Sequence, residues 1–309
     1  MSTSKSSSNL VFDYQTLRLI VGALAFAFPA VAIARSGKIT TSISSSYWEP
    51  NARDFFVGFL FVIGALLISY KGHLQAGVGK LKWLTMYQED MISTIGGMAA
   101  IFTALNPTAR DGAPMNTHAC IHVTGAFILF STVVYFCAIA FLRSINQKLL
   151  VYFGRKAEND IIKQVKSDEI KSFIKDVKKF RKEKSRTDIN LFARFWNFLF
   201  LEMSTFRILT NKEFVYEKQK GVKENLKVSQ VFSMEVRRGW IYVVCGSIIL
   251  VDLAAFIILM VTLSSLVANT RITFVIETIA LGFFGVAWMT ASQFDFWSPI
   301  KKWVQSRRT

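Results

Sequence analysis

The amino-acid sequence predicts an all-α fold: a polytopic transmembrane bundle of six helices with an amphipathic helical insert in the cytoplasm. Three observations support this prediction. Hydrophobic residues make up 52% of the chain, and the mean hydropathy is +0.35. Charged residues make up 19%, against about 25% in an average soluble domain. The apolar residues gather in long blocks, while most of the net charge of +16 falls in one segment between blocks.

Six apolar blocks approach or exceed the length a helix needs to cross the hydrocarbon core, about 20 residues. They cover residues 17–35, 55–71, 90–107, 119–142, 240–263 and 272–290. The third block contains Ser, Thr and two Gly residues, so it spans only if Glu89 and Asp90 lie at the interface. We therefore divide the chain into a flexible tail 1–16, four spans in 17–142, an insert 143–238, two spans in 239–292 and a basic tail 293–309.

Small residues inside the blocks predict where helices pack closely. Ser93, Gly96 and Gly97 lie in the third block, and Gly58 and Gly64 lie in the second. Small side chains let two membrane helices approach each other. The three cysteines form no CxxC pair and predict buried thiols rather than a disulfide framework.

The distribution of Lys and Arg sets the predicted orientation. The loop after the second span, the insert and the C-terminal tail are the segments rich in these residues. The alternate loops are poorer, with Lys38 and Arg53 in the first, Arg110 in the next and Arg271 in the last. Both termini of this multi-pass integral membrane protein are therefore expected in the cytoplasm.

The insert 143–238 carries 23 Lys or Arg against 12 Asp or Glu, which is +11 of the net charge. Charge concentrated beside membrane spans suits anionic lipid headgroups or a protein partner rather than nucleic acid. Apolar residues recur at helical spacing over 159–183 and predict an amphipathic helix. The aromatic run 189–203 predicts either a helix lying in the membrane interface or one packed on the cytoplasmic end of the bundle.

Polar residues gather at the predicted outer face. Arg53 and Asp54 open the second span, His122 lies near the start of the fourth, and Glu277 lies inside the sixth. A carboxylate inside a span is costly unless it is paired or protonated. We therefore expect Asp54, His122 and Glu277 to share a layer, as a structural network or as a ligand site, with Arg53 as a binding residue or an interfacial anchor.

Two alternatives involve chemistry. His118 and His122 lie four residues apart on one helical face and could ligate zinc, with Asp54 or Glu277 completing the site of a metal-dependent hydrolase. Asp252 lies at mid-depth in the fifth span and suggests proton coupling in a transporter. No Walker motif, Gly-x-Ser-x-Gly elbow or Rossmann loop points to other enzymes. Whether the protein is an enzyme stays open.

A Ser69-x-x-x-His73 motif together with His118-x-x-x-His122 resembles the pattern of seven-span membrane hydrolases, the alkaline ceramidases and adiponectin-receptor relatives. In that group three histidines share one zinc ion. The predicted topology places His73 at the cytoplasmic face and the other two histidines at the outer face. Six spans are predicted here rather than seven.

The sequence also resembles a family of bacterial six-span membrane proteins of uncharacterised activity. The resemblance lies in YQTLRLIVGALAFAFP, SISSSYWEPNARDFFVGFLFVIGALLISYKGH, ALNPT, IHVTGAFILFSTVVYFCAIAFL, RRGWIYVVCGSIIL and FVIETIALGFFGVAWMT. It implies a bacterial inner-membrane location, with Arg53, Asp54, His122 and Glu277 as the recurring polar positions. The long insert departs from the family's short connection. The resemblance supplies no activity. From the polar residues we expect binding of a ligand or lipid headgroup at the outer face, and from the basic insert a contact with anionic lipid or a partner protein.

Overall fold

A computed structural model describes residues 14–70, 88–110, 113–154, 167–186, 191–218, 222–262 and 271–293. Most of these residues are helical, as the composition predicts. His73, nearly all of the tail 1–16 and all but the first residue of the tail 293–309 lie outside the described residues. So does the start of the amphipathic segment 159–183.

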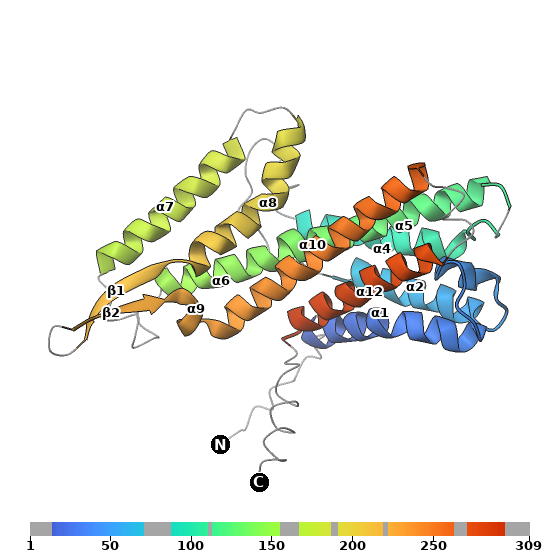
Figure 1. Cartoon of the computed structure of the whole chain (residues 1–309), viewed down its shortest axis with the longest axis horizontal. Helices are drawn as coiled ribbons and strands as arrows, with labels where there is room; N and C mark the ends of the chain where they lie inside the picture. Colours follow the sequence, from blue (N-terminus) through green and yellow to red (C-terminus); the bar gives the residue numbers. More distant parts are fainter. Residues whose placement is uncertain are drawn as a thin grey trace, which may run out of the picture.

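A helix lies at each of the six predicted blocks, and the six run side by side along the bundle (Figure 1). Their contacts close them into a ring. Each helix contacts the next one along the chain, and the last contacts the first. The helices are α1 (Tyr14–Ser36), α2 (Arg53–Ile68), α4 (Gln88–Leu105), α5 (Thr117–Tyr135), α10 (Ser233–Thr262) and α12 (Ile272–Ala291).

Five segments of the described chain are long and apolar enough to cross a membrane. They are Gln15–Ser36, Pro50–Ile68, Thr117–Phe153, Ser233–Thr262 and Ile272–Ala291. Large apolar side chains on these helices face outward: Val251 is 67% exposed and Phe26 is 57% exposed. Such an apolar exterior is compatible with surrounding lipid. Helix α4 falls outside this set; its sequence QEDMISTIGGMAAIFTAL opens with three polar residues, Gln88, Glu89 and Asp90.

Helix α4 is held between α2 and α5 by small residues. A Cβ on Gly97 would lie 2.5 Å from the Gly64 carbonyl oxygen of α2, and one on Gly96 would lie 2.5 Å from Thr132 of α5. The backbones therefore approach as closely as the small residues predict. Gly58 is different, because a Cβ there would meet nothing within 4 Å.

Helix α5 does not end at the predicted boundary of the insert. It continues through a π-helical turn, η2 (Phe136–Phe141), into α6 (Leu142–Gly154). One cluster of buried side chains also extends from the bundle into the insert, from Phe28 and Leu60 to Phe153 and Phe214. The insert is thus built as an outgrowth of α5 and α10 rather than as a detached module (Figure 1).

The rest of the insert is a packed helical layer with one hairpin. Helices α7 (Ser167–Arg186) and α8 (Leu191–Thr210) are followed by β1 (Glu213–Lys218), β2 (Val222–Lys227) and the short α9 (Val228–Val231). The strands pair antiparallel, with Glu213 opposite Lys227. This hairpin was not predicted from the sequence. Its residue Phe214 packs edge-on against Phe173, with ring centroids 5.7 Å apart.

Helix α8 includes most of the aromatic run 189–203, which was predicted to lie either in the membrane interface or on the cytoplasmic end of the bundle. Phe206 and Leu209 are almost completely buried, and α8 contacts α6, α7 and η2. The second half of α8 thus packs on the end of the bundle. Most side chains of the aromatic run 189–203 lie outside the described residues, so both placements of that run stay predictions. Helix α7 begins at Ser167, and its Ile170 and Val177 are buried on the same layer.

A buried ionic cluster ties this layer to α6. The Glu202 carboxylate of α8 lies 3.2 Å from Arg143 Nε and 2.7 Å from Arg181 Nη2, and it accepts a hydrogen bond of 2.9 Å from Asn146 Nδ2. Arg143 also lies 3.7 Å from Glu89 of α4. Buried charges need such partners, because an unpaired ion in the interior is costly.

Candidate functional site

A cavity of about 730 Å³ lies between α5, α10, α12 and the segment 41–45. Its volume falls in the range of small-molecule sites, roughly 300–1,000 Å³. Most of its wall is apolar, with Phe127, Phe130, Phe256 and Ile257 among the lining residues. Hydroxyl groups gather at the end formed by the loops. The cavity is thus mostly apolar along its length, with the acidic Asp252 in that part of the wall, and polar at the predicted outer end.

His122 reaches this cavity from the first turns of α5. The helix begins there because the Asn116 side chain caps it, accepting a 2.8 Å hydrogen bond from the Ala119 amide. His122 is 2% exposed. Its Nδ1 lies 2.7 Å from the Asn106 carbonyl oxygen and 3.0 Å from that of Thr103. A carbonyl only accepts, so Nδ1 carries the proton.

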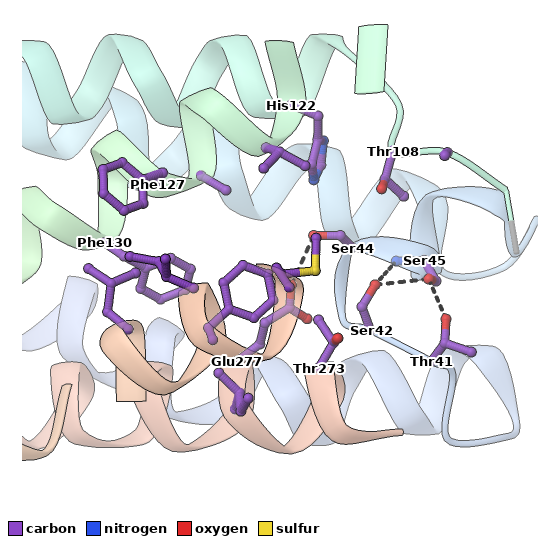
Figure 2. A pocket seen from close by; sticks show the side chains of 18 of the residues that line it. Thr41, Ser42, Ser44, Ser45, Thr108, His122, Phe127, Phe130, Thr273 and Glu277 are labelled. Carbon is purple, nitrogen blue, oxygen red and sulfur yellow. Dashed lines mark hydrogen bonds between the residues drawn. The ribbon is translucent and has the colours of Figure 1, made fainter. Parts of the chain in front are cut away.

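The second ring nitrogen of His122 is left as an acceptor. Nε2 is buried and has no hydrogen-bond partner among the described residues. Figure 2 shows the ring directed from α5 into the cavity. Phe56 stacks on the ring with centroids 6.2 Å apart, which limits its rotation. A buried acceptor aimed into a cavity is a place where a ligand donor gains a hydrogen bond.

Glu277 lies in α12 on the facing wall of the cavity (Figure 2). Its carboxylate accepts hydrogen bonds from the Ile43 amide and, at 3.3 Å, from the Ser44 hydroxyl. The Phe274 amide also donates to the Thr41 carbonyl oxygen at 3.1 Å. Glu277 thus fastens the segment 41–45 onto α12. The sequence predicts a partner for this carboxylate, and the structure supplies it from this segment.

Hydroxyl side chains of the segment 41–45 form the polar end of the cavity. Ser45 Oγ lies 2.8 Å from both Thr41 Oγ1 and Ser42 Oγ, and the short helix η1 (Ser44–Trp48) follows. Sequence reasoning missed these residues as site candidates. The run TTSISSS, seven residues with six hydroxyls directly before a predicted span, was the available signal.

Arg53 and Asp54 do not line the cavity. Both are exposed at the start of α2. Arg53 donates a 3.0 Å hydrogen bond to the Tyr47 hydroxyl and lies over its ring, 4.7 Å from the centroid. Asp54 occupies the first turn of α2, where a negative charge stabilises the helix dipole. The structure brings His122 and Glu277 into one cavity and leaves these two residues outside it.

Asp252 lines the same cavity, closer to the middle of α10. It is half-buried. The sequence places Asp252 at mid-depth in its span, deeper than the outer-face residues. The cavity connects them, because its wall follows α10 from Ile249 to Val261.

The predicted zinc ligands occupy different environments. His118 is exposed, and its Nδ1 lies 2.8 Å from Asn106 Oδ1, whereas His122 is buried. Within the described ranges, no group of three or more His, Cys, Asp or Glu side chains could hold a metal ion. His73, the third histidine of the hydrolase pattern, lies outside those ranges. Zinc binding stays a prediction from the sequence.

Comparison with known protein families, curated proteins and solved structures found no match to this chain. The resemblance to bacterial six-span membrane proteins therefore stays a prediction.

Proposed function

We propose that this chain is a multi-pass inner-membrane protein with cytoplasmic termini that binds an amphipathic ligand in the cavity between α5, α10 and α12. The ligand has a hydrocarbon part and a head that carries a hydroxyl or another hydrogen-bond donor. The observation behind this proposal is the buried Nε2 of His122, which has no partner among the described residues, at the polar end of a mostly apolar cavity.

The wall of the cavity sets the chemistry of each part of the ligand. Phe127, Phe130 and Phe256 offer an apolar surface for the hydrocarbon. At the other end His122 Nε2 accepts, and the Ser44 oxygen, whose proton is donated to Glu277, can accept a further hydrogen bond. A head with hydroxyl groups supplies the donors that both atoms need.

A photoactivatable monoacylglycerol with a diazirine in its acyl chain tests the proposal. It has one hydrocarbon chain and a head of two hydroxyls. We expect saturable labelling of the purified full-length protein on α5 and α10. Ala126→Trp places an indole in the cavity and should weaken labelling by about tenfold, which corresponds to about 1.4 kcal/mol of binding free energy.

Ala254→Trp is the matched control. Ala254 lies on α10 but is exposed and does not line the cavity, so this variant should label like the wild-type protein. Equal labelling of both tryptophan variants, or labelling that never saturates, would show that the probe reports surrounding lipid rather than a cavity.

A further inference from the structure

A second cavity, of about 170 Å³, lies at the opposite end of the helix ring. Its wall includes residues near the starts of α1 and α10. The first cavity instead lies near the segment that follows α1, and it extends along α10 to Val261. The remaining wall comes from the end of α2, the start of α4, α6 and the end of α12. The predicted topology places this cavity at the cytoplasmic face.

Three cations from three helices line the second cavity: Arg18 of α1, Lys148 of α6 and Arg238 of α10. Arg18 is positioned by the Tyr70 hydroxyl at 3.0 Å and the Ala291 carbonyl oxygen at 3.3 Å. Its Nε is buried and has no acceptor among the described residues. Arg238 donates to the Gln293 carbonyl oxygen at 3.3 Å. These contacts fix the guanidinium groups without neutralising their charge.

Arg18, Lys148 and Arg238 bring three positive charges to the wall of one small cavity. Like charges gathered in a small space are costly unless an anion joins them.

One carboxylate, that of Glu89, also lines the second cavity. It lies 3.7 Å from Arg143 Nη1, so part of its charge is balanced outside the cavity. The remaining polar lining includes the hydroxyls of Tyr70, Tyr242 and Ser144. Because the Tyr70 oxygen accepts from Arg18, its proton is available to donate to another group.

We infer that the second cavity binds a phosphate group through Arg18, Lys148 and Arg238. Guanidinium groups bind phosphate oxygens through parallel hydrogen bonds, and lysine adds a point charge. The phosphate belongs either to an anionic phospholipid headgroup, which is abundant at the cytoplasmic leaflet, or to free phosphate. This inference is independent of the ligand proposed for the first cavity.

The test uses full-length protein in maltoside micelles, which contain no phosphate. One arm titrates inorganic phosphate by calorimetry. The other compares retention of phosphatidic acid and of diacylglycerol with the same chains by native mass spectrometry. Lys148→Gln and Arg238→Gln remove charges from the second cavity. Arg237→Gln and Lys178→Gln remove exposed charges outside it.

We expect each of the two cavity variants to weaken phosphate-dependent binding by about tenfold or more, because each loses a charge-assisted hydrogen bond. The controls should stay within about twofold of the wild-type protein. Retention of phosphatidic acid over diacylglycerol identifies a lipid headgroup, and binding of inorganic phosphate alone identifies the free ion. Lys148 is exposed at the rim, so Lys148→Gln should fold even if Arg238→Gln does not.

The inference is overturned if the wild-type protein binds neither phosphate probe. It is also overturned if the cavity variants and the control variants lose binding equally, because the binding would then reflect general surface charge.

Discussion

At the residue scale, His122 shows how backbone geometry prepares a side chain for a ligand. Helix α4 ends at Leu105. The carbonyl oxygens of Thr103 and Asn106 therefore accept no hydrogen bond from a backbone amide of the helix. Both are satisfied by Nδ1 of His122. The same contacts leave Nε2 as a buried acceptor. The end of one helix thus sets the hydrogen-bonding character of a residue on the next.

The tautomer of His122 is a direct prediction of this geometry. Nitrogen NMR of ¹⁵N-histidine-labelled protein should show His122 neutral, with Nδ1 protonated and Nε2 unprotonated. The chain has three histidines, so loss of one signal pair in His122→Gln assigns the resonance. A spectrum with the proton on Nε2 would contradict the proposed acceptor role.

At the element scale, α8 is anchored by a carboxylate rather than by its apolar residues alone. Glu202 is 1% exposed and meets Arg143 of α6 and Arg181 of α7. This cluster determines where the insert sits on α5 and α6. The three residues lie far apart in the sequence. From the sequence alone, each is therefore interpreted as an ordinary charge exposed to solvent.

Removing the Glu202 charge should therefore destabilise the insert. Glu202→Gln leaves two guanidinium groups without their shared carboxylate and should lower the free energy of unfolding by about 3 kcal/mol. Denaturant titration of the protein in micelles measures this change. Glu183→Gln on α7 is the control: its side chain is 66% exposed and pairs with Lys179 at 3.9 Å, so about 0.5 kcal/mol or less is expected. Equal losses in the two variants would show that the cluster contributes no more than a surface pair.

At the scale of the whole molecule, the helix ring encloses two cavities of different character. Helix α10 meets the turn η2 at Gly246, where a Cβ would lie 3.2 Å from the Ala138 amide nitrogen. From Ile249 onward, α10 lines the larger, apolar cavity. The smaller, cationic cavity lies at the other end of the ring. The proposed ligands, an amphipathic molecule and a phosphate group, follow from this difference.

The sequence predicts the helices better than it predicts which way their side chains point. Helix positions follow from long apolar blocks, and a helix was found at each one. Side-chain direction depends on how each helix is rotated about its axis, and one residue along a helix turns that direction by about 100°. Asp54 is consequently exposed while Phe56, two residues later, is buried beside His122.

The prediction of the candidate site from the sequence was also limited by the unknown direction of the side chains around each helix. His122 and Glu277 were placed at one depth, and the structure places both in the wall of one cavity. Depth alone did not exclude Arg53 and Asp54, because it carries no information on direction around the bundle. The partners of Glu277 were missed since they come from a backbone amide and a serine in a loop.

An experimental density map of the protein in lipid nanodiscs with the monoacylglycerol probe tests the central claim most directly. The proposal predicts elongated density between α5 and α10, with the head of the probe within about 3 Å of His122 Nε2. A cavity filled only by water, or a head bound instead beside Arg53 and Asp54, would contradict the proposed site.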